Sequence, residues 1–198
     1  MARRVTFEVV TGPGVRATVL NPLAAEQEGG ITRVRLGDFV AEQEVTLLVA
    51  VEVEPRATGE VASLQCRVSD RDGVLPALPM QVDWAAVSEE QDRDQPVNRD
   101  VIVAVARMLA EGARLLALSE NRKGGYGDAR RALGSVAEQI RRLGDDTAIR
   151  EVADLLAHEE GAFSQAMAAK EMKARHYAAY KAAYSRDPGG SARKRKGD

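Results

Sequence analysis

The sequence predicts an α+β protein in which an N-terminal antiparallel β-sandwich of immunoglobulin type precedes a C-terminal antiparallel helical bundle. Apolar side chains alternate with period two through the first half of the chain, which is typical of half-buried strands. After residue 97 they recur every three or four residues, which is typical of amphipathic helices. We therefore expect a sandwich over residues 1–86, an acidic linker over 87–97, a bundle over 98–185 and a disordered basic tail over 186–198.

Composition excludes several classes of protein. The net charge of -2 gives the 198-residue chain no overall attraction to nucleic acid or to membranes. The single cysteine, Cys66, excludes an internal disulfide framework and fits a reducing compartment. The N-terminus does not read as a signal peptide, and no apolar run reaches the length of a membrane helix. These features predict a cytoplasmic protein.

Six strands are predicted in the first half, at residues 4–10, 15–19, 31–36, 45–53, 61–69 and 78–84. The alternation is clearest over 45–53, so we expect this strand to be central and buried on one face. Leu36, Gly37 and Asp38 predict a turn after the third strand, because glycine adopts backbone conformations closed to other residues.

The Asp-Gly pair that ends Asp70-Arg71-Asp72-Gly73 predicts a hairpin turn between the last two strands. The segment also resembles part of a calcium loop, but the remaining ligands and the closing glutamate are absent. Cys66 is interpreted as a core residue, because both histidines, His158 and His176, lie far away in the helical half. Those histidines have no third ligand at a suitable spacing, so we expect no zinc site.

Four helices are predicted in the second half, at residues 98–121, 127–143, 148–160 and 162–185. Asn98 is the expected N-cap of the first, and Asp146 or Thr147 that of the third. The expected buried stripe of the first helix consists of Val101, Val105, Met108, Leu109, Leu115 and Leu116. The expected seam of the second consists of Ala129, Leu133, Val136, Ile140 and Leu143. The third is expected to bury Ile149, Val152, Leu155 and Leu156.

The turn between the first two helices carries a short motif. Gly124, Tyr126, Ala129 and Leu133 fit the pattern G-x-Y-x-x-A-x-x-x-L, which resembles the inter-helix turn of tetratricopeptide repeats. Only one such hairpin is visible. The GGYG stretch could instead cradle a phosphate, but it follows a helix and lacks the G-K-[ST] sequence that nucleotide sites need. We therefore predict no cofactor.

The last helix carries the candidate partner-binding residues. Tyr177, Tyr180 and Tyr184 stand at positions i, i+3 and i+7, with Lys173 and Lys181 among the lysines around them. Such a helix can bind an RNA, a membrane surface or a partner protein. Alternatively, its tyrosines pack onto the helix's own bundle while its lysines are solvated.

Two stretches together carry a family resemblance: VRLGDFVAEQEVTLLVAVEVEP at 34–55 and ARMLAEGARLLALSENRKGGYGDARRAL at 106–133. With the hairpin ending at Trp84 and the acidic linker between them, they resemble the region that follows the A domain in bacterial von Willebrand factor A (VWA) proteins. The resemblance implies a sandwich with a Leu-Gly-Asp turn and a hairpin with a Gly-x-Tyr turn. The A domain and its D-x-S-x-S motif are absent from this sequence, so the resemblance implies no bound magnesium. It also implies that the sandwich lacks a strand, leaving an edge that another chain can pair with.

These observations favour a non-enzymatic protein–protein interaction or scaffolding module, with a separate VWA-domain protein as an expected partner. The alternative is binding to an anionic polymer or membrane surface through the basic C-terminal helix and tail. An enzyme is not predicted, because no carboxylate pair, nucleophile–base pair or metal cluster can be named from the sequence.

Overall fold

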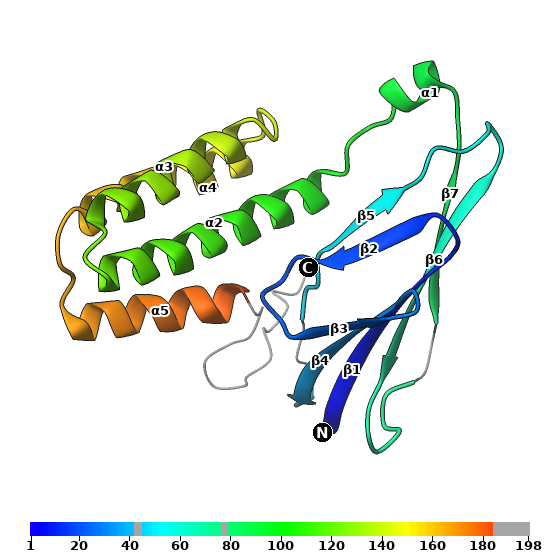
Figure 1. Cartoon of the computed structure of the whole chain (residues 1–198), viewed down its shortest axis with the longest axis horizontal. Coiled ribbons are helices and arrows are strands. Elements are labelled where there is room, and N and C mark those ends of the chain that lie inside the picture. Colours follow the sequence, from blue (N-terminus) through cyan, green and yellow to red (C-terminus); the bar gives the residue numbers. More distant parts are fainter. Residues whose placement is uncertain (42–44, 77–78, 184–198) are drawn as a thin grey trace, which may run out of the picture. The chain divides into compact units, whose positions relative to one another are not determined.

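The computed structural model describes residues 1–41, 45–76 and 79–183, with the side chains of Lys181 and Ala183 excepted. The chain is an α+β protein with two compact units, the first ending at Pro96 and the second beginning at Val97 (Figure 1). All strand pairs are antiparallel and lie in the first unit. None of the helices in the described residues is long and apolar enough to cross a membrane.

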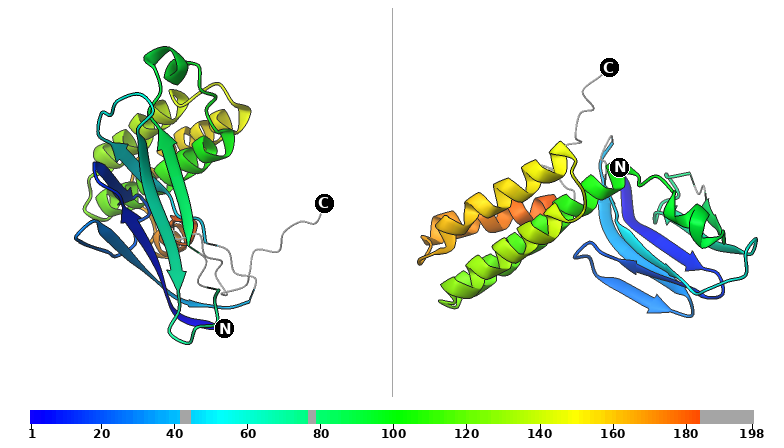
Figure 2. Two further views of the ribbon diagram at one scale, coloured as in Figure 1. Left: turned by 90° about the vertical axis from the view of Figure 1, so that its right-hand side faces the viewer. Right: turned by 90° about the horizontal axis from the view of Figure 1, so that it is seen from above.

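The first unit contains a five-stranded sheet in the order β3-β4-β1-β6-β7 and a separate two-stranded ribbon, β2-β5 (Figure 2). The strands are β1 (Ala2–Thr11), β2 (Val15–Val19), β3 (Ala25–Glu28), β4 (Ile31–Phe39), β5 (Val49–Val53), β6 (Val61–Ser69) and β7 (Met80–Ala85). Val9 of β1 packs with Ala17 of β2 and Leu64 of β6 in one buried cluster, so the ribbon lies across one face of the sheet.

The centre of this unit is β1, whereas the sequence predicted it at residues 45–53. β1 pairs with β4 on one side and β6 on the other, and its Val5 and Val9 are completely buried. The strand in the predicted region is shorter, Val49–Val53, and it pairs only with β2. The prediction was wrong because alternation shows which side chains share a face, but not how many strands lie beside it.

Leu36, Gly37 and Asp38 lie inside β4 and form no turn, which corrects a second prediction. The pairing of β1 with β4 shifts register on either side of Val5, which is opposite Gly37. Gly37 has φ 80°, and the Asp38 Oδ1 accepts a hydrogen bond of 2.8 Å from the backbone N–H of Arg4. Glycine is therefore needed here for a β-bulge, which bends a strand while pairing continues on both sides.

The ribbon leaves the inner face of β7 partly uncovered. Met80 and Trp84 lie opposite Cys66 and Ala62 of β6, so all four side chains share the face that the ribbon covers. Cys66 and Ala62 are buried, but Met80 is 59% and Trp84 37% exposed. Strand β3, which the sequence did not predict, forms the opposite edge of the sheet, and its four residues are all exposed. The sequence did not predict β3 because its exposed Ala, Glu and Gln residues have low strand propensity and show no alternation of apolar and polar side chains.

The predicted turn at Asp70 to Gly73 is present after β6, where the N–H of Gly73 donates a 3.4 Å hydrogen bond to the carbonyl of Asp70. Its Asp70 carboxylate accepts hydrogen bonds from the backbone N–H groups of Asp72, Val74 and Leu75 at 2.8 to 3.2 Å. These bonds, that from Leu75 first, hold the pKa of Asp70 below its ordinary value. The carboxylate therefore organises the loop.

The helical segments are α1 (Glu89–Arg93), α2 (Arg99–Arg122), α3 (Tyr126–Arg141), α4 (Thr147–His158), the 3-10 helix η1 (Glu159–Phe163) and α5 (Ala169–Ala183). Asn98 and Asp146 cap α2 and α4, as the sequence predicted. The stretch predicted as linker contains α1, and Ser88 and Gln91 form a capping box at the N-terminus of this helix. The predicted 162–185 helix is broken, because η1 and an irregular stretch precede α5. Residues 184–198 lie outside the described part.

Alanines, rather than the larger side chains, form the buried face of α2. Its buried apolar residues recur every three or four positions: Val103, Ala106, Ala110, Ala113 and Ala117, with Leu118 beside them. Of the predicted stripe, only Leu109 packs against the core, and Val101 and Leu116 are each 51% exposed. Small side chains let helix backbones approach closely, so the bundle selects the alanine face. The seam of α3 was predicted well, with Ala129, Leu133 and Ile140 fully buried.

Candidate functional site

The outward face of α5 carries three of the predicted partner-binding residues. The inward face of this helix is fixed by Ala179, which is buried, and by Met172, which packs against the bundle core. Lys173, Tyr177 and Tyr180 lie on the other side and are exposed, the tyrosines by 51% and 44%. Neither tyrosine belongs to the apolar core of the helical unit. Tyr184 and the side chain of Lys181 lie outside the described residues.

His176 extends this surface, and sequence reasoning had not assigned it there. Its ring stacks on that of Tyr180, with the centroids 6.4 Å apart and the planes inclined by 16°. Positions 173, 176, 177 and 180 follow helical spacing, so they form one strip. We call Lys173, His176, Tyr177 and Tyr180 the α5 strip.

An open hollow of about 300 Å³ lies beside the α5 strip, where the C-terminal end of α2 meets the first turns of α5. It is lined by Arg122, Ala169, Met172, Lys173 and His176. Ala169 and Met172 supply apolar surface, whereas Arg122 and Lys173 are exposed cations that form no ion pair among the described residues. No acidic side chain from the described part of the chain lines the hollow. The arrangement suits a ligand that combines negative charge with a small apolar group.

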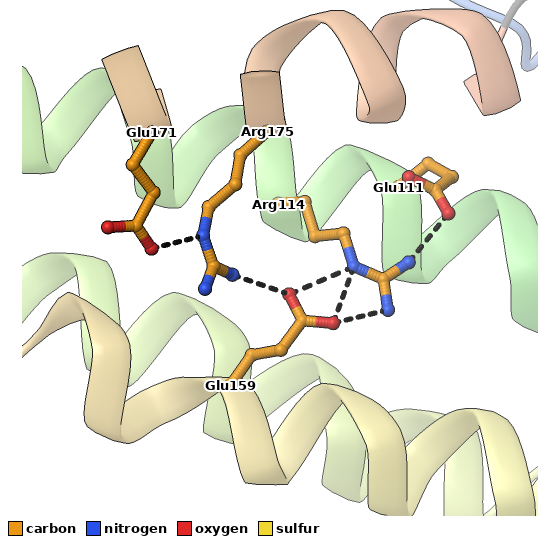
Figure 3. Close-up of polar contacts among 5 residues, drawn as sticks. All are labelled: Glu111, Arg114, Glu159, Glu171 and Arg175. Atoms are coloured by element: carbon orange, nitrogen blue, oxygen red, sulfur yellow. Dashed lines mark hydrogen bonds and ion pairs between the residues drawn. The ribbon is translucent and has the colours of Figure 1, made fainter. Parts of the chain in front are cut away.

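A partly buried ionic network holds α5 against the bundle (Figure 3). Arg114 of α2 donates to Glu159 of η1 at 2.7 Å and to Glu111 at 2.6 Å. Glu159 also lies 3.8 Å from Arg175 of α5, whose guanidinium stands 5.7 Å from the centre of the Phe163 ring. This series of alternating negative and positive side chains thus joins α2, η1 and α5.

Burial affects the two groups at the α2 end of this network differently. Desolvation raises the pKa of Glu111, and the nearby Arg114 only partly offsets that effect. Burial also opposes the charged form of Arg114, but hydrogen bonds and charges from Glu159 and Glu111 outweigh it and raise its pKa. Arg114 therefore stays charged and pairs with both carboxylates.

Asn121, near the end of α2, fixes the segment that leads into α5. Its amide donates a 2.8 Å hydrogen bond to the carbonyl of Gln165, and its carbonyl oxygen accepts one of 3.2 Å from the N–H of Met167. The side chain is almost completely buried, with the residue 3% exposed. These partners lie more than forty residues away, so no local pattern in the sequence could indicate them.

The remaining motif residues have structural positions. Gly124 adopts φ 83° just after α2, and Tyr126 begins α3. Ala129 and Leu133 are completely buried between the helices. In the first unit, the Cys66 thiol lies in the core and burial raises its pKa. No group of three or more histidine, cysteine or acidic side chains that could hold a metal occurs among the described residues.

Comparison with known proteins yields one solved structure to report. It is a "von Willebrand factor type A from Catenulispora acidiphila", with a TM-score of 0.49 and 16% sequence identity. The similar region covers 81% of the present chain and 37% of the other, so this chain spans well under half of that protein's length. No protein-family model matches the chain, and no curated protein matches it.

Proposed function

We propose that the chain is a non-enzymatic protein–protein interaction module whose helical unit binds an acidic segment of a partner protein at the α5 strip and the adjoining hollow. The observation that carries the proposal is that aromatic and cationic side chains share the exposed face of a helix whose opposite face is buried. Aromatic residues that offer both an apolar ring and a polar tip are enriched at protein interfaces.

The chemistry of the partner follows from the lining of the hollow. Arg122 and Lys173 have no acidic partner among the described residues. A carboxylate of a partner protein can therefore form an ion pair with them without displacing an internal one. Met172 and Ala169 offer a place for one apolar side chain. The ionic network and Asn121 hold α5 in place, which lowers the entropy cost of binding.

The test uses a library of fluorescent peptides that place Asp and Glu around one Leu or Phe, read by anisotropy. Wild-type protein is expected to bind, and Lys173→Glu and Tyr177→Ala are each expected to weaken binding about ten-fold or more. Arg130→Glu is the matched control, because Arg130 is an exposed cation of α3 outside the strip. Equal loss in Lys173→Glu and Arg130→Glu would show that only overall charge matters, and would contradict the proposed surface.

The alternative function, binding to an anionic polymer or membrane surface, rests on the same cations. It predicts retention on heparin or on anionic vesicles that falls steeply with salt and survives Tyr177→Ala. A purified VWA-domain protein is the first natural partner to test, as the sequence resemblance suggests. Binding that EDTA abolishes would identify a metal-dependent contact on the partner's side.

A further inference from the structure

The outer side of α2 carries an apolar stripe that the bundle does not use. Five apolar residues and one glycine lie within an arc about 100° wide on this side of the helix. They are Val101, Val105, Met108, Gly112, Leu115 and Leu116. None of the five apolar residues belongs to the core of the helical unit. This set, with Gly112, is the outer α2 stripe.

The outer α2 stripe is uncharged along its whole length. Positions 104 and 119, which fall within or beside the arc, are alanine and serine. The charged residues of α2 lie outside the arc; among them, Arg114 pairs with Glu111 and Arg99 pairs with Asp146 of the α4 cap. The spacing of Val101, Val105, Met108, Gly112 and Leu115 alternates between four and three, which is the pattern of a helix that packs against another helix.

We propose that the outer α2 stripe is a self-association surface, on which α2 of a second copy packs in antiparallel orientation. Residues 184–198 of this chain are a poor candidate to cover the stripe, because they read YSRDPGGSARKRKGD and supply almost no apolar side chains. A second copy brings an apolar stripe of equal length. Arg122 contributes to both surfaces, but the apolar stripe itself shares no residue with the α5 strip.

Charge at the two ends of α2 favours the antiparallel orientation. Asp100 and Arg122 are both exposed and lie toward the same flank of the stripe, near opposite ends of the helix. A two-fold axis close to Gly112 places Asp100 beside Arg122 of the second copy, and the reverse pair at the other end. In a parallel pair, both Asp100 residues lie at one end and both Arg122 residues at the other, so no pair between Asp100 and Arg122 forms. Glu111, on the same flank near the axis, already forms an ion pair with Arg114 at 2.6 Å.

Gly112 allows the two helices to approach closely. Among the residues that the structure describes, no atom from outside the helix backbone lies within 4 Å of the position that a side chain would take at Gly112. In the antiparallel pair, Met108 falls between Gly112 and Leu115 of the second copy, and its flexible thioether can fill the gap above the glycine.

The experiment is light scattering and analytical ultracentrifugation of the full chain over a concentration series. Wild-type protein is expected to form a dimer, and Leu116→Lys is expected to weaken dimerisation about ten-fold or more. Leu155→Lys is the matched control, because Leu155 is an exposed leucine of α4 outside the stripe, and it should leave the dimer intact. Circular dichroism establishes that each variant retains its helices.

A charge exchange tests the orientation. Asp100→Arg and Arg122→Asp are each expected to weaken the dimer, and the double variant is expected to restore it, because the opposite charges again face each other. Wild-type protein that stays monomeric at every concentration would overturn the proposal. So would a dimer that persists in folded Leu116→Lys, or a double variant weaker than both single ones.

Discussion

The Asn121→Ala substitution tests whether a single buried amide fixes the position of α5. It removes a donor to Gln165 at 2.8 Å and an acceptor for Met167 at 3.2 Å, and leaves both backbone groups without these partners. Each such bond contributes about 1 kcal/mol, and a buried group left unpaired costs about 1–3 kcal/mol. We expect the free energy of unfolding of the helical unit to fall by about 2–3 kcal/mol, measured by urea titration with circular dichroism at 222 nm as the helical signal.

The position of the loss distinguishes this mechanism from general destabilisation. Amide hydrogen exchange should accelerate most in residues 163–183, because the connection into α5 is the part that Asn121 holds. Ser119→Ala, at an exposed position two residues away on the same helix, should change the free energy of unfolding by less than about 0.5 kcal/mol. A loss below that value in Asn121→Ala, or acceleration spread evenly over all helices, would refute the reasoning.

Three further predictions concern the bulge, the choice of buried face and pH. Gly37→Ala should lower the free energy of unfolding of the first unit by about 1–2 kcal/mol, because φ of 80° strains any other residue. The fluorescence of Trp84, the chain's one tryptophan, reports the unfolding of this unit alone. An unchanged free energy of unfolding would show that glycine is not required here. Leu156→Ala should cost about 2–5 kcal/mol by urea titration, because Leu156 is fully buried, whereas Leu155→Ala should cost less than about 0.5 kcal/mol; equal losses would contradict the packing of α4. The pKa of Asp146 is lowered by Arg99 and by the backbone N–H of Ala148, so its stabilisation should be complete above the ordinary value of 3.8 and disappear as pH falls through the lowered pKa. The advantage of wild type over Asp146→Asn in urea titrations should therefore shrink in acid, and an advantage that grows in acid would refute the assignment.

The strands show which part of the fold could be predicted. Alternation located β1, β2, β4 and β6 to within a few residues, because the alternating side chains of a strand separate a buried from an exposed face. The same signal misplaced the centre of the sheet, since Val5 and Val9 are flanked by two strands that meet them only in the folded chain. Gly37 was recognised as a special position, but the bulge exists only because β1 runs alongside it.

The candidate site divides in the same way. The spacing of Lys173, Tyr177 and Tyr180 placed them on one face of a helix, and that face is exposed. The hollow beside them also needs Arg122, which lies about fifty residues away and reaches the site only through the packing of α2 on α5.

The sequence by itself determined the α+β class, the caps at Asn98 and Asp146 and the grouping of side chains on helix and strand faces, because each depends on residues within a few positions of one another. Tertiary structure alone decided which face of α2 is buried. On α2 it selected the alanines over the larger Val101 and Leu116, because small side chains allow the helices to approach closely. The bonds of Asn121, the network around Arg114 and the hollow at Arg122 join residues distant in sequence, and only folding brings them together.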